Sequence, residues 1–225
     1  MKIGGWQKVS LIDYPGEVST VIFTVGCNMR CPYCHNPELV KEHNFHGKYI
    51  NEKTIIDFIK KKNKKHDFID GIVICGGEPT EQIDLIKFCK IMKRELGIKV
   101  KLDTNGSNPK ILKQLNRQKL VDYLAMDVKV GQLNNKNYLE SVNYAKRFPD
   151  YEFRLTVVPK MIHAYNIKRF MKPFKKAKKM YLQRFYKRKG LLSNLFNKVK
   201  DYSDDELNML CSLVSKYFQK CEVRR

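Results

Sequence analysis

The sequence predicts an α/β protein folded as an open, partial (βα)6 barrel. Six short runs of β-branched and apolar residues alternate with longer amphipathic stretches along most of the chain. Parallel strands need crossover helices between them, and right-handed crossovers curl such a sheet in one direction. The predicted strands are residues 18–25, 70–75, 99–104, 121–129, 151–159 and 178–185.

The stretches between these strands have the apolar spacing of helices that bury one face. The first of them has apolar side chains at positions 55, 56 and 59, which lie on one side of a helix. The second repeats the pattern from position 83 to position 96. The predicted helices are residues 51–65, 82–96, 109–116, 135–148 and 164–174.

The last part of the chain is different. Ser203 precedes an acidic first turn, so we expect a capped terminal helix added to the barrel. The predicted organisation is therefore a barrel over residues 1–189 and a C-terminal helical extension over residues 190–225.

The composition is that of a globular protein with a strong positive charge. The chain has 225 residues, 43% of them hydrophobic, and a formal net charge of +21 with a pI near 9.7. This charge suits nucleic acid, anionic lipid or an acidic protein partner and does not choose among them. Its densest runs, residues 168–180 and 184–190, are interpreted as solvated faces and strand ends.

The location is expected to be the cytoplasm, without a membrane span. The sequence has no apolar run of about 18 residues, and its first residues lack the apolar core of a secretory signal. Seven cysteines, an odd number with uneven spacing, favour metal binding over disulfides in a reducing compartment.

The candidate chemistry is placed where parallel strands end. In α/β barrels and open parallel sheets, sites form at the carboxyl ends of the strands. The predicted strands end at three clustered cysteines and at four short motifs. These are Cys27, Cys31 and Cys34, "GGEP" at 76–79, "DTNG" at 103–106, "DVK" at 127–129 and "TVVP" at 156–159.

The spacing C-x3-C-x2-C lets one loop carry three thiolates to a single metal centre. A structural zinc site needs four ligands, so His35 or a distant cysteine would have to complete it. The usual ferredoxin spacing, which supplies four cysteines, is not present. Three thiolates on a four-iron cluster leave one iron without a protein ligand, and a catalytic cluster needs such an open position.

These residues resemble those of a known superfamily. C-x3-C-x2-C with Tyr33 before the third cysteine, followed one βα unit later by "GGEP", is similar to the radical S-adenosylmethionine superfamily over roughly residues 1–185. The motifs "SLIDYPG" and "CHNPEL" narrow the resemblance to the glycyl-radical-enzyme activating proteins. The anaerobic ribonucleoside-triphosphate reductase activating protein is the most similar of these.

The resemblance implies a reaction and its cofactors. Cys27, Cys31 and Cys34 would hold a 4Fe-4S cluster whose fourth iron takes the amino and carboxylate groups of S-adenosylmethionine. Reductive cleavage would give a 5'-deoxyadenosyl radical that abstracts hydrogen from a glycine of a partner enzyme. The implied partners are that glycyl-radical enzyme and an electron donor such as flavodoxin or ferredoxin.

The same resemblance gives roles to the other motifs. Gly76 and Gly77 would let the backbone approach the methionine amino group, and Glu78 would balance its charge. Lys129 and Arg154 would meet the carboxylate or ribose. The full set of expected cofactor contacts is Tyr33, Gly76, Gly77, Glu78, Thr104, Asn105, Asp127, Lys129 and Arg154.

Plainer interpretations of these residues stay open. "GGEP" and "DTNG" are also typical of tight turns, and a single Lys or Arg is often a surface charge. Cys75, Cys89, Cys211 and Cys221 are interpreted as small buried apolar residues.

Three functions compete at this point. The first is an activating enzyme for a glycyl-radical enzyme. The second is a related enzyme that acts on a small molecule or RNA, of the carboxy-deazaguanine synthase or tRNA-modifier type. The third is a zinc-stabilised nucleic-acid-binding module without enzymatic activity.

Overall fold

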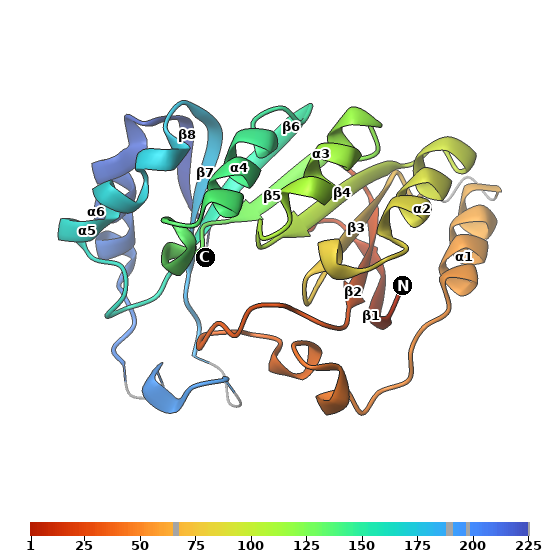
Figure 1. Ribbon diagram of the computed structural model, residues 1–225, viewed down its shortest axis with the longest axis horizontal. Coiled ribbons are helices and arrows are strands. Elements are labelled where there is room, and N and C mark those ends of the chain that lie inside the picture. Colours follow the sequence, from red (N-terminus) through yellow and green to blue (C-terminus); the bar gives the residue numbers. More distant parts are fainter. Residues whose placement is uncertain (65–67, 188–190, 197–198, 225) are drawn as a thin grey trace.

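The computed structural model contains one eight-stranded sheet in which strand order follows chain order from β1 to β8. It describes residues 1–64, 68–187, 191–196 and 199–224. Strand β1 pairs with β2 antiparallel, and the pairs from β2 to β8 are parallel. Helices cover one face of the sheet (Figure 1). The prediction of an open parallel α/β barrel is confirmed.

The predicted strands are present with nearly the predicted bounds. Their central residues are fully buried, as expected for parallel strands that carry helices on one face. The six strands are β2 Ser19–Thr24, β3 Gly71–Gly76, β4 Lys99–Thr104, β5 Tyr123–Asp127, β6 Asp150–Val157 and β7 Ala177–Arg184.

Two further strands form the edges of the sheet, and the sequence analysis did not predict them. Strand β1 is Ile3–Ser10, and its "GG" pair is unfavourable for a strand. Strand β8 is Phe218–Arg224, and four of its seven residues are charged or amide side chains. Both have low strand propensity, and pairing with one neighbour decides their conformation.

The helices occupy the predicted stretches, and several begin at side-chain caps. Asn108 Oδ1 accepts from the Ile111 N–H, and Ser203 forms a reciprocal capping box with Glu206, as the acidic first turn predicts. The helices are α1 Glu52–Lys64, α2 Leu85–Lys90, which continues as a π turn over Ile91–Glu95, α3 Pro109–Arg117, α4 Lys136–Ala145, α5 Ala164–Phe170 and α6 Asp204–Ser215.

The main core lies between the helices and the sheet. It includes fully buried side chains such as Ile55 and Ile59 of α1 and Leu112 of α3, packed with sheet residues such as Ile72 and Leu102. Burying one such side chain contributes about 1.5 to 3 kcal/mol. Among the residues that the structure describes, no helix is both long enough and apolar enough to cross a membrane.

The opposite face of the sheet carries a smaller cluster and the polar residues of the site. Tyr14, from the loop after β1, packs near Tyr123 with ring centroids 6.0 Å apart and lies close to Gly71. The "SLIDYPG" motif therefore folds under this open face, at the amino ends of the strands. The polar side chains described below lie toward the carboxyl ends.

The C-terminal extension is helical only in part. Its helix α6 is present, but the chain then returns as β8 and pairs parallel with β7. Arg224 of β8 donates to both carboxylate oxygens of Glu152 at 2.7 Å, and Glu152 has no exposed surface. The sheet therefore has seven parallel strands where the sequence analysis expected six.

Candidate functional site

One cavity of about 380 Å³ lies at the carboxyl ends of the central strands. Its volume falls in the range of about 300 to 1,000 Å³ that is usual for small-molecule sites. The structure brings all twelve predicted site residues to its wall. These are Cys27, Cys31, Tyr33, Cys34, Gly76, Gly77, Glu78, Thr104, Asn105, Asp127, Lys129 and Arg154.

The three cysteines lie on the loop that follows β2. A backbone hydrogen bond from the Cys27 N–H to the Val40 carbonyl joins the two ends of the loop, and one from the Cys34 N–H to the Cys31 carbonyl closes a turn inside it, each 3.0 Å. All three thiols are free and half-buried. Burial raises the pKa of Cys27 and of Cys34.

The thiols are not packed as ligands of one metal ion. In the described part of the chain, no three His, Cys, Asp or Glu side chains converge closely enough to hold one. A four-iron cluster places each thiolate on a different iron atom, so its cysteines need to line a cavity rather than meet at a point. The loop has that arrangement.

Gly76 and Gly77 allow the turn after β3 to pack against the start of the cysteine loop. Gly76 has φ +111°, and a Cβ there would lie 2.2 Å from the Thr24 backbone nitrogen. A Cβ on Gly77 would lie 2.1 Å from the Gly26 carbonyl oxygen. The close approach that requires glycine is therefore to the neighbouring backbone, whereas the sequence analysis assigned it to the ligand.

Glu78 is buried and ties two of the motifs together. It accepts from the Thr80 hydroxyl at 2.6 Å, the Thr104 hydroxyl at 2.7 Å and the Asn105 N–H at 2.6 Å. Burial raises the pKa of Glu78, and these hydrogen bonds oppose the shift. The Thr104 hydroxyl donates to Glu78 and accepts from the Gly106 N–H, so its expected hydrogen bond to a ligand competes with two internal ones.

Asn105 connects the "DTNG" loop to the cysteine loop. Its side-chain amide donates to Asn28 Oδ1 at 3.0 Å and approaches Cys27 Sγ at 3.8 Å. The side-chain oxygen of Asn105, Oδ1, accepts from the Ser107 N–H at 2.9 Å. Asn105 therefore orients the first cysteine of the loop.

A chain of alternating charges crosses the wall of the cavity. Arg154 Nη1 lies 2.7 Å from Asp103, and its Nε lies 3.0 Å from Asp127. Lys101 pairs with Asp103 at 2.6 Å, and Lys129 pairs with Asp127 at 3.0 Å. Arg154, Lys129 and both carboxylates line the cavity together with Asp13 and Glu78, whereas Lys101 is not among its lining residues.

The ion pairs keep both carboxylates charged. Burial alone would raise the pKa of Asp103, but Arg154 and Lys101 outweigh it and bring the pKa to about 2. The pKa of Asp127 is also lowered, since Lys129 and Arg154 outweigh its burial. The pKa of Lys129 is raised because Asp127 outweighs the effect of burial.

The charge chain includes Lys101 and Asp103, to which the sequence analysis gave no role, although Asp103 begins the "DTNG" motif. Lys101 is 4% exposed. Lysine is almost never buried this deeply without a partner, and here the partner is Asp103. Lys101 and Asp103 are two positions apart on β4, so both face the same side of the sheet. The strand leads directly into the "DTNG" motif. This period of two was the available signal.

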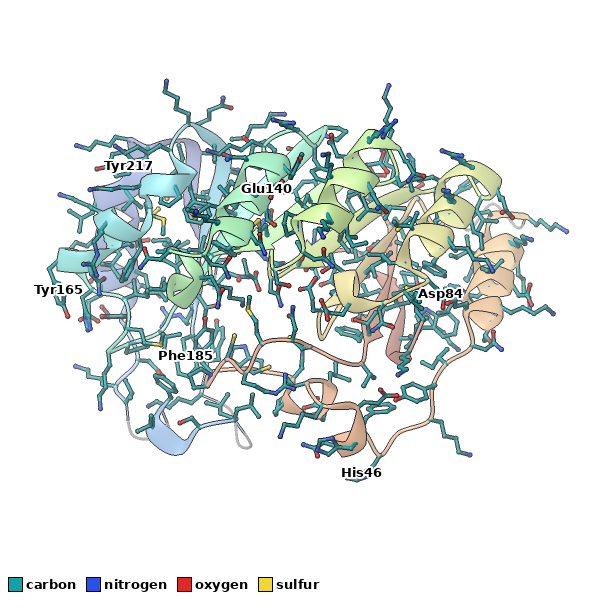
Figure 2. The ribbon with its side chains drawn as sticks, viewed as in Figure 1. His46, Asp84, Glu140, Tyr165, Phe185 and Tyr217 are labelled. Carbon is teal, nitrogen blue, oxygen red and sulfur yellow. The ribbon has the colours of Figure 1, made fainter. Side chains whose placement is uncertain are left out.

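The third cysteine is buttressed by aromatic residues. His35 stacks on Phe185 with ring centroids 5.8 Å apart, and its Nε2 lies 3.0 Å from the Tyr186 carbonyl oxygen. Figure 2 shows Phe185 beside the loop that carries the cysteines. The ring of Tyr33 lies under the Lys129 ammonium and makes an edge contact with the Phe196 ring. Burial raises the pKa of Tyr33 to about 12.

Comparison with known proteins identifies the family. Residues 21–186 match the radical SAM superfamily. A protein of Methanocaldococcus jannaschii, provisionally named as a glycyl-radical enzyme activating enzyme, is 34% identical over 99% of this chain and 95% of its own length. The chain therefore belongs to the radical SAM superfamily, as its cysteine motif predicts.

Other relatives match over shorter lengths. The pyruvate formate-lyase-activating enzyme of Streptococcus mutans is 34% identical over 56% of this chain, and the match spans half of that enzyme. Among solved structures, SuiB of Streptococcus suis has a TM-score of 0.61 over 90% of this chain and 48% of its own, at 16% identity. TYW1 has a TM-score of 0.56 over 88% of this chain and 73% of its own, at 14% identity. These structural likenesses support the fold.

The cofactors of this superfamily are a 4Fe-4S cluster and S-adenosylmethionine, and the residues of the cavity fit them. The three loop thiols match the donor set of a cluster with one open iron. Lys129 and Arg154 supply cationic groups for a carboxylate, and Glu78 supplies an acidic oxygen for an ammonium group. The wall thus matches the two charges of the amino acid portion of S-adenosylmethionine.

Proposed function

We propose that the protein generates a glycyl radical on a partner enzyme, and that this partner is the anaerobic ribonucleoside-triphosphate reductase. The observation that carries the proposal is the position of the C-terminal segment. None of the described residues from 191 onward lines the cavity. They pack beside the cysteine loop or extend the sheet at its edge, so this segment does not fill the open side of the barrel.

An open side is what a protein substrate needs. Strands β1 and β8 end the sheet and do not pair with each other. A loop of a partner protein can approach the cavity from this side, and hydrogen abstraction requires reacting atoms within about 3 to 3.5 Å. An enzyme for a small substrate would have to close the same side to exclude water.

The chain's own residues bind and orient the reactants. When bound, the reduced cluster and S-adenosylmethionine supply the 5'-deoxyadenosyl radical that takes a hydrogen from the glycine Cα. Lys129 and Arg154 would hold the cofactor carboxylate, and Glu78, which fixes the loops around it, would hold the ammonium. Tyr33 keeps Lys129 at the cavity wall through its ring face, 5.9 Å from the Lys129 Nζ.

The choice of partner is supported by motifs and by relatives. The 34% identical protein of M. jannaschii and the pyruvate formate-lyase-activating enzymes carry names from the same functional class. The "SLIDYPG" and "CHNPEL" motifs resemble the reductase-activating proteins most closely within it. An acidic partner surface would suit the net charge of +21 and is the reason to favour electrostatic attraction in the encounter.

The decisive experiment is spectroscopic. The reduced, cluster-loaded protein is incubated anaerobically with S-adenosylmethionine and the reductase of the same organism, and the electron paramagnetic resonance spectrum is recorded. We expect a glycyl doublet on the reductase. It should be absent with Cys31→Ala and retained with Cys89→Ala, since Cys89 is buried on α2 away from the loop.

The alternatives give different results in the same experiment. Efficient formation of 5'-deoxyadenosine without a doublet on any glycyl-radical enzyme would favour a small-molecule or RNA substrate. Protein that binds zinc and cannot be reconstituted with iron and sulfide would favour the nucleic-acid-binding module. Either outcome would overturn the proposal.

A further inference from the structure

Cys211 and Cys221 face each other at the C-terminal edge of the sheet. Cys211 lies on α6 and Cys221 lies in the middle of β8, and their Sγ atoms are 2.9 Å apart. The sequence analysis treated both as small buried residues and gave no reason for them to meet. Their contact is produced by the return of the chain from α6 into β8.

The two sulfur atoms are closer than in ordinary van der Waals packing. The S–S bond of a disulfide is about 2.05 Å long, so the two sulfurs are separated by about 0.9 Å more than a covalent bond requires. The other cysteines outside the cysteine loop, Cys75 and Cys89, have no second cysteine in such close contact among the residues that the structure describes. Cys89 is buried on α2, and the Cys75 thiol donates to the Ile22 carbonyl at 3.4 Å.

We propose that Cys211 and Cys221 form a dithiol site that closes to a disulfide by exchange with a small-molecule disulfide such as oxidised glutathione. Cys221 is the more exposed of the two, while Cys211 is 8% exposed. The external disulfide therefore reaches Cys221 first, although contact with Cys211 raises the pKa of Cys221 and lowers that of Cys211. Cys211, already in contact, completes the exchange.

The exchange balances without any other reactant. The Cys221 thiolate attacks one sulfur of the external disulfide, whose S–S bond breaks and releases one small thiol. The Cys211 thiolate then attacks Cys221 Sγ in the mixed disulfide, and the second small thiol leaves. The protein loses two thiol hydrogens as it is oxidised, and the external disulfide is reduced to two thiols.

The crosslink fastens a strand at the edge of the sheet. Strand β8 lies at the end of the sheet, pairs with β7 alone and contacts α6 on one face. Its Arg224 provides the bidentate partner of the fully buried Glu152. An edge strand opens more easily than a central one, and opening would leave Glu152 buried without its counter-ion. Tying β8 to α6 keeps Arg224 on Glu152.

The test uses the full-length, cluster-loaded protein under anaerobic conditions, so that oxygen is not an oxidant. The protein is treated with oxidised glutathione, and free thiols are then alkylated in denaturant before mass measurement and peptide mapping. We expect two fewer alkylated cysteines than in dithiothreitol-treated protein, and a peptide pair joined through residues 211 and 221. Hydrogen exchange at the β8 amides should slow by about tenfold in the crosslinked form.

Matched variants separate this site from general oxidation. Cys89→Ser should form the same crosslink, whereas Cys221→Ser should form none and should keep Cys211 as a free or singly modified thiol. Wild-type protein in which both cysteines remain alkylated, or in which Cys221 keeps a stable glutathione adduct, would overturn the proposal. A crosslink that leaves exchange at β8 unchanged would refute its stabilising role.

Discussion

Replacing Arg154 with Gln is the most informative change in the cavity wall. Arg154 bridges Asp103 and Asp127, and the variant would leave each of these half-buried carboxylates with one lysine only. Removing one member of a buried ion pair costs about 3 to 5 kcal/mol. Because each carboxylate keeps a second cation, we expect the low end, a loss of about 3 kcal/mol in the free energy of unfolding at pH 7.

The pH dependence tests the same contact. Burial tends to raise the pKa of Asp103, but Arg154 and Lys101 hold it at about 2, below the unfolded value of about 3.9. A carboxyl whose folded pKa is depressed adds stability that is complete above the unfolded pKa and is lost as the pH falls through the folded pKa. Wild-type protein should therefore lose stability from Asp103 between about pH 4 and pH 2. The variant should lose less, because the pKa of its Asp103 lies closer to the unfolded value.

Urea unfolding followed by circular dichroism at pH 7 and pH 3 measures both effects. The difference in the free energy of unfolding between wild type and Arg154→Gln should be about 1 kcal/mol smaller at pH 3 than at pH 7. Arg147→Gln is the matched control, since Arg147 is exposed and should change stability by less than about 0.5 kcal/mol. Equal stability of the two variants at pH 7, or a difference that does not change with pH, would refute the role given to the charge chain.

Four further predictions concern the site and the C-terminal segment. Replacing all three loop cysteines with Ala should abolish the brown chromophore, and a full complement of four irons in that variant would contradict the assignment. Lys129→Ala should weaken S-adenosylmethionine binding by roughly ten- to a hundredfold, whereas Lys136→Ala, at the exposed start of α4, should not change it. Ser203→Ala should lower stability by about 1 kcal/mol through loss of the α6 cap, and a thermal melt identical to wild type would argue against the capping box. Association with the partner enzyme should weaken as salt rises, which titration at two ionic strengths can measure, and an affinity independent of salt would exclude electrostatic steering.

The sequence by itself determined the central strands, the helices and the position of the cavity. The spacing of apolar residues and the local composition are signals within a short stretch of chain, so the six inner strands could be predicted nearly to their ends. Parallel strands place their carboxyl ends together, so motifs as far apart in the chain as Cys27 and Lys129 could be assigned to one site. Cys27, Glu78 and Lys129 were found in this way.

The tertiary structure decided what each polar group contacts. Glu78 was expected to meet a ligand, and the fold also gives it the hydroxyl of Thr104 and the N–H of Asn105. Lys101 and Asp103 received no role, because the period of two along β4 places them on one face but does not show that Arg154 pairs with Asp103. The reason is physical: pair energies depend on distance and burial, and neither is a property of a local stretch of chain.

The edges of the sheet show the same limit. Strands β1 and β8 have weak strand propensity, and they form because a neighbouring strand offers its hydrogen-bonding edge. The contact between Cys211 and Cys221 follows from that pairing, since β8 must lie against α6 before the two thiols can meet. Local sequence encodes which residues prefer a strand or a helix, whereas long-range packing encodes which of them become neighbours.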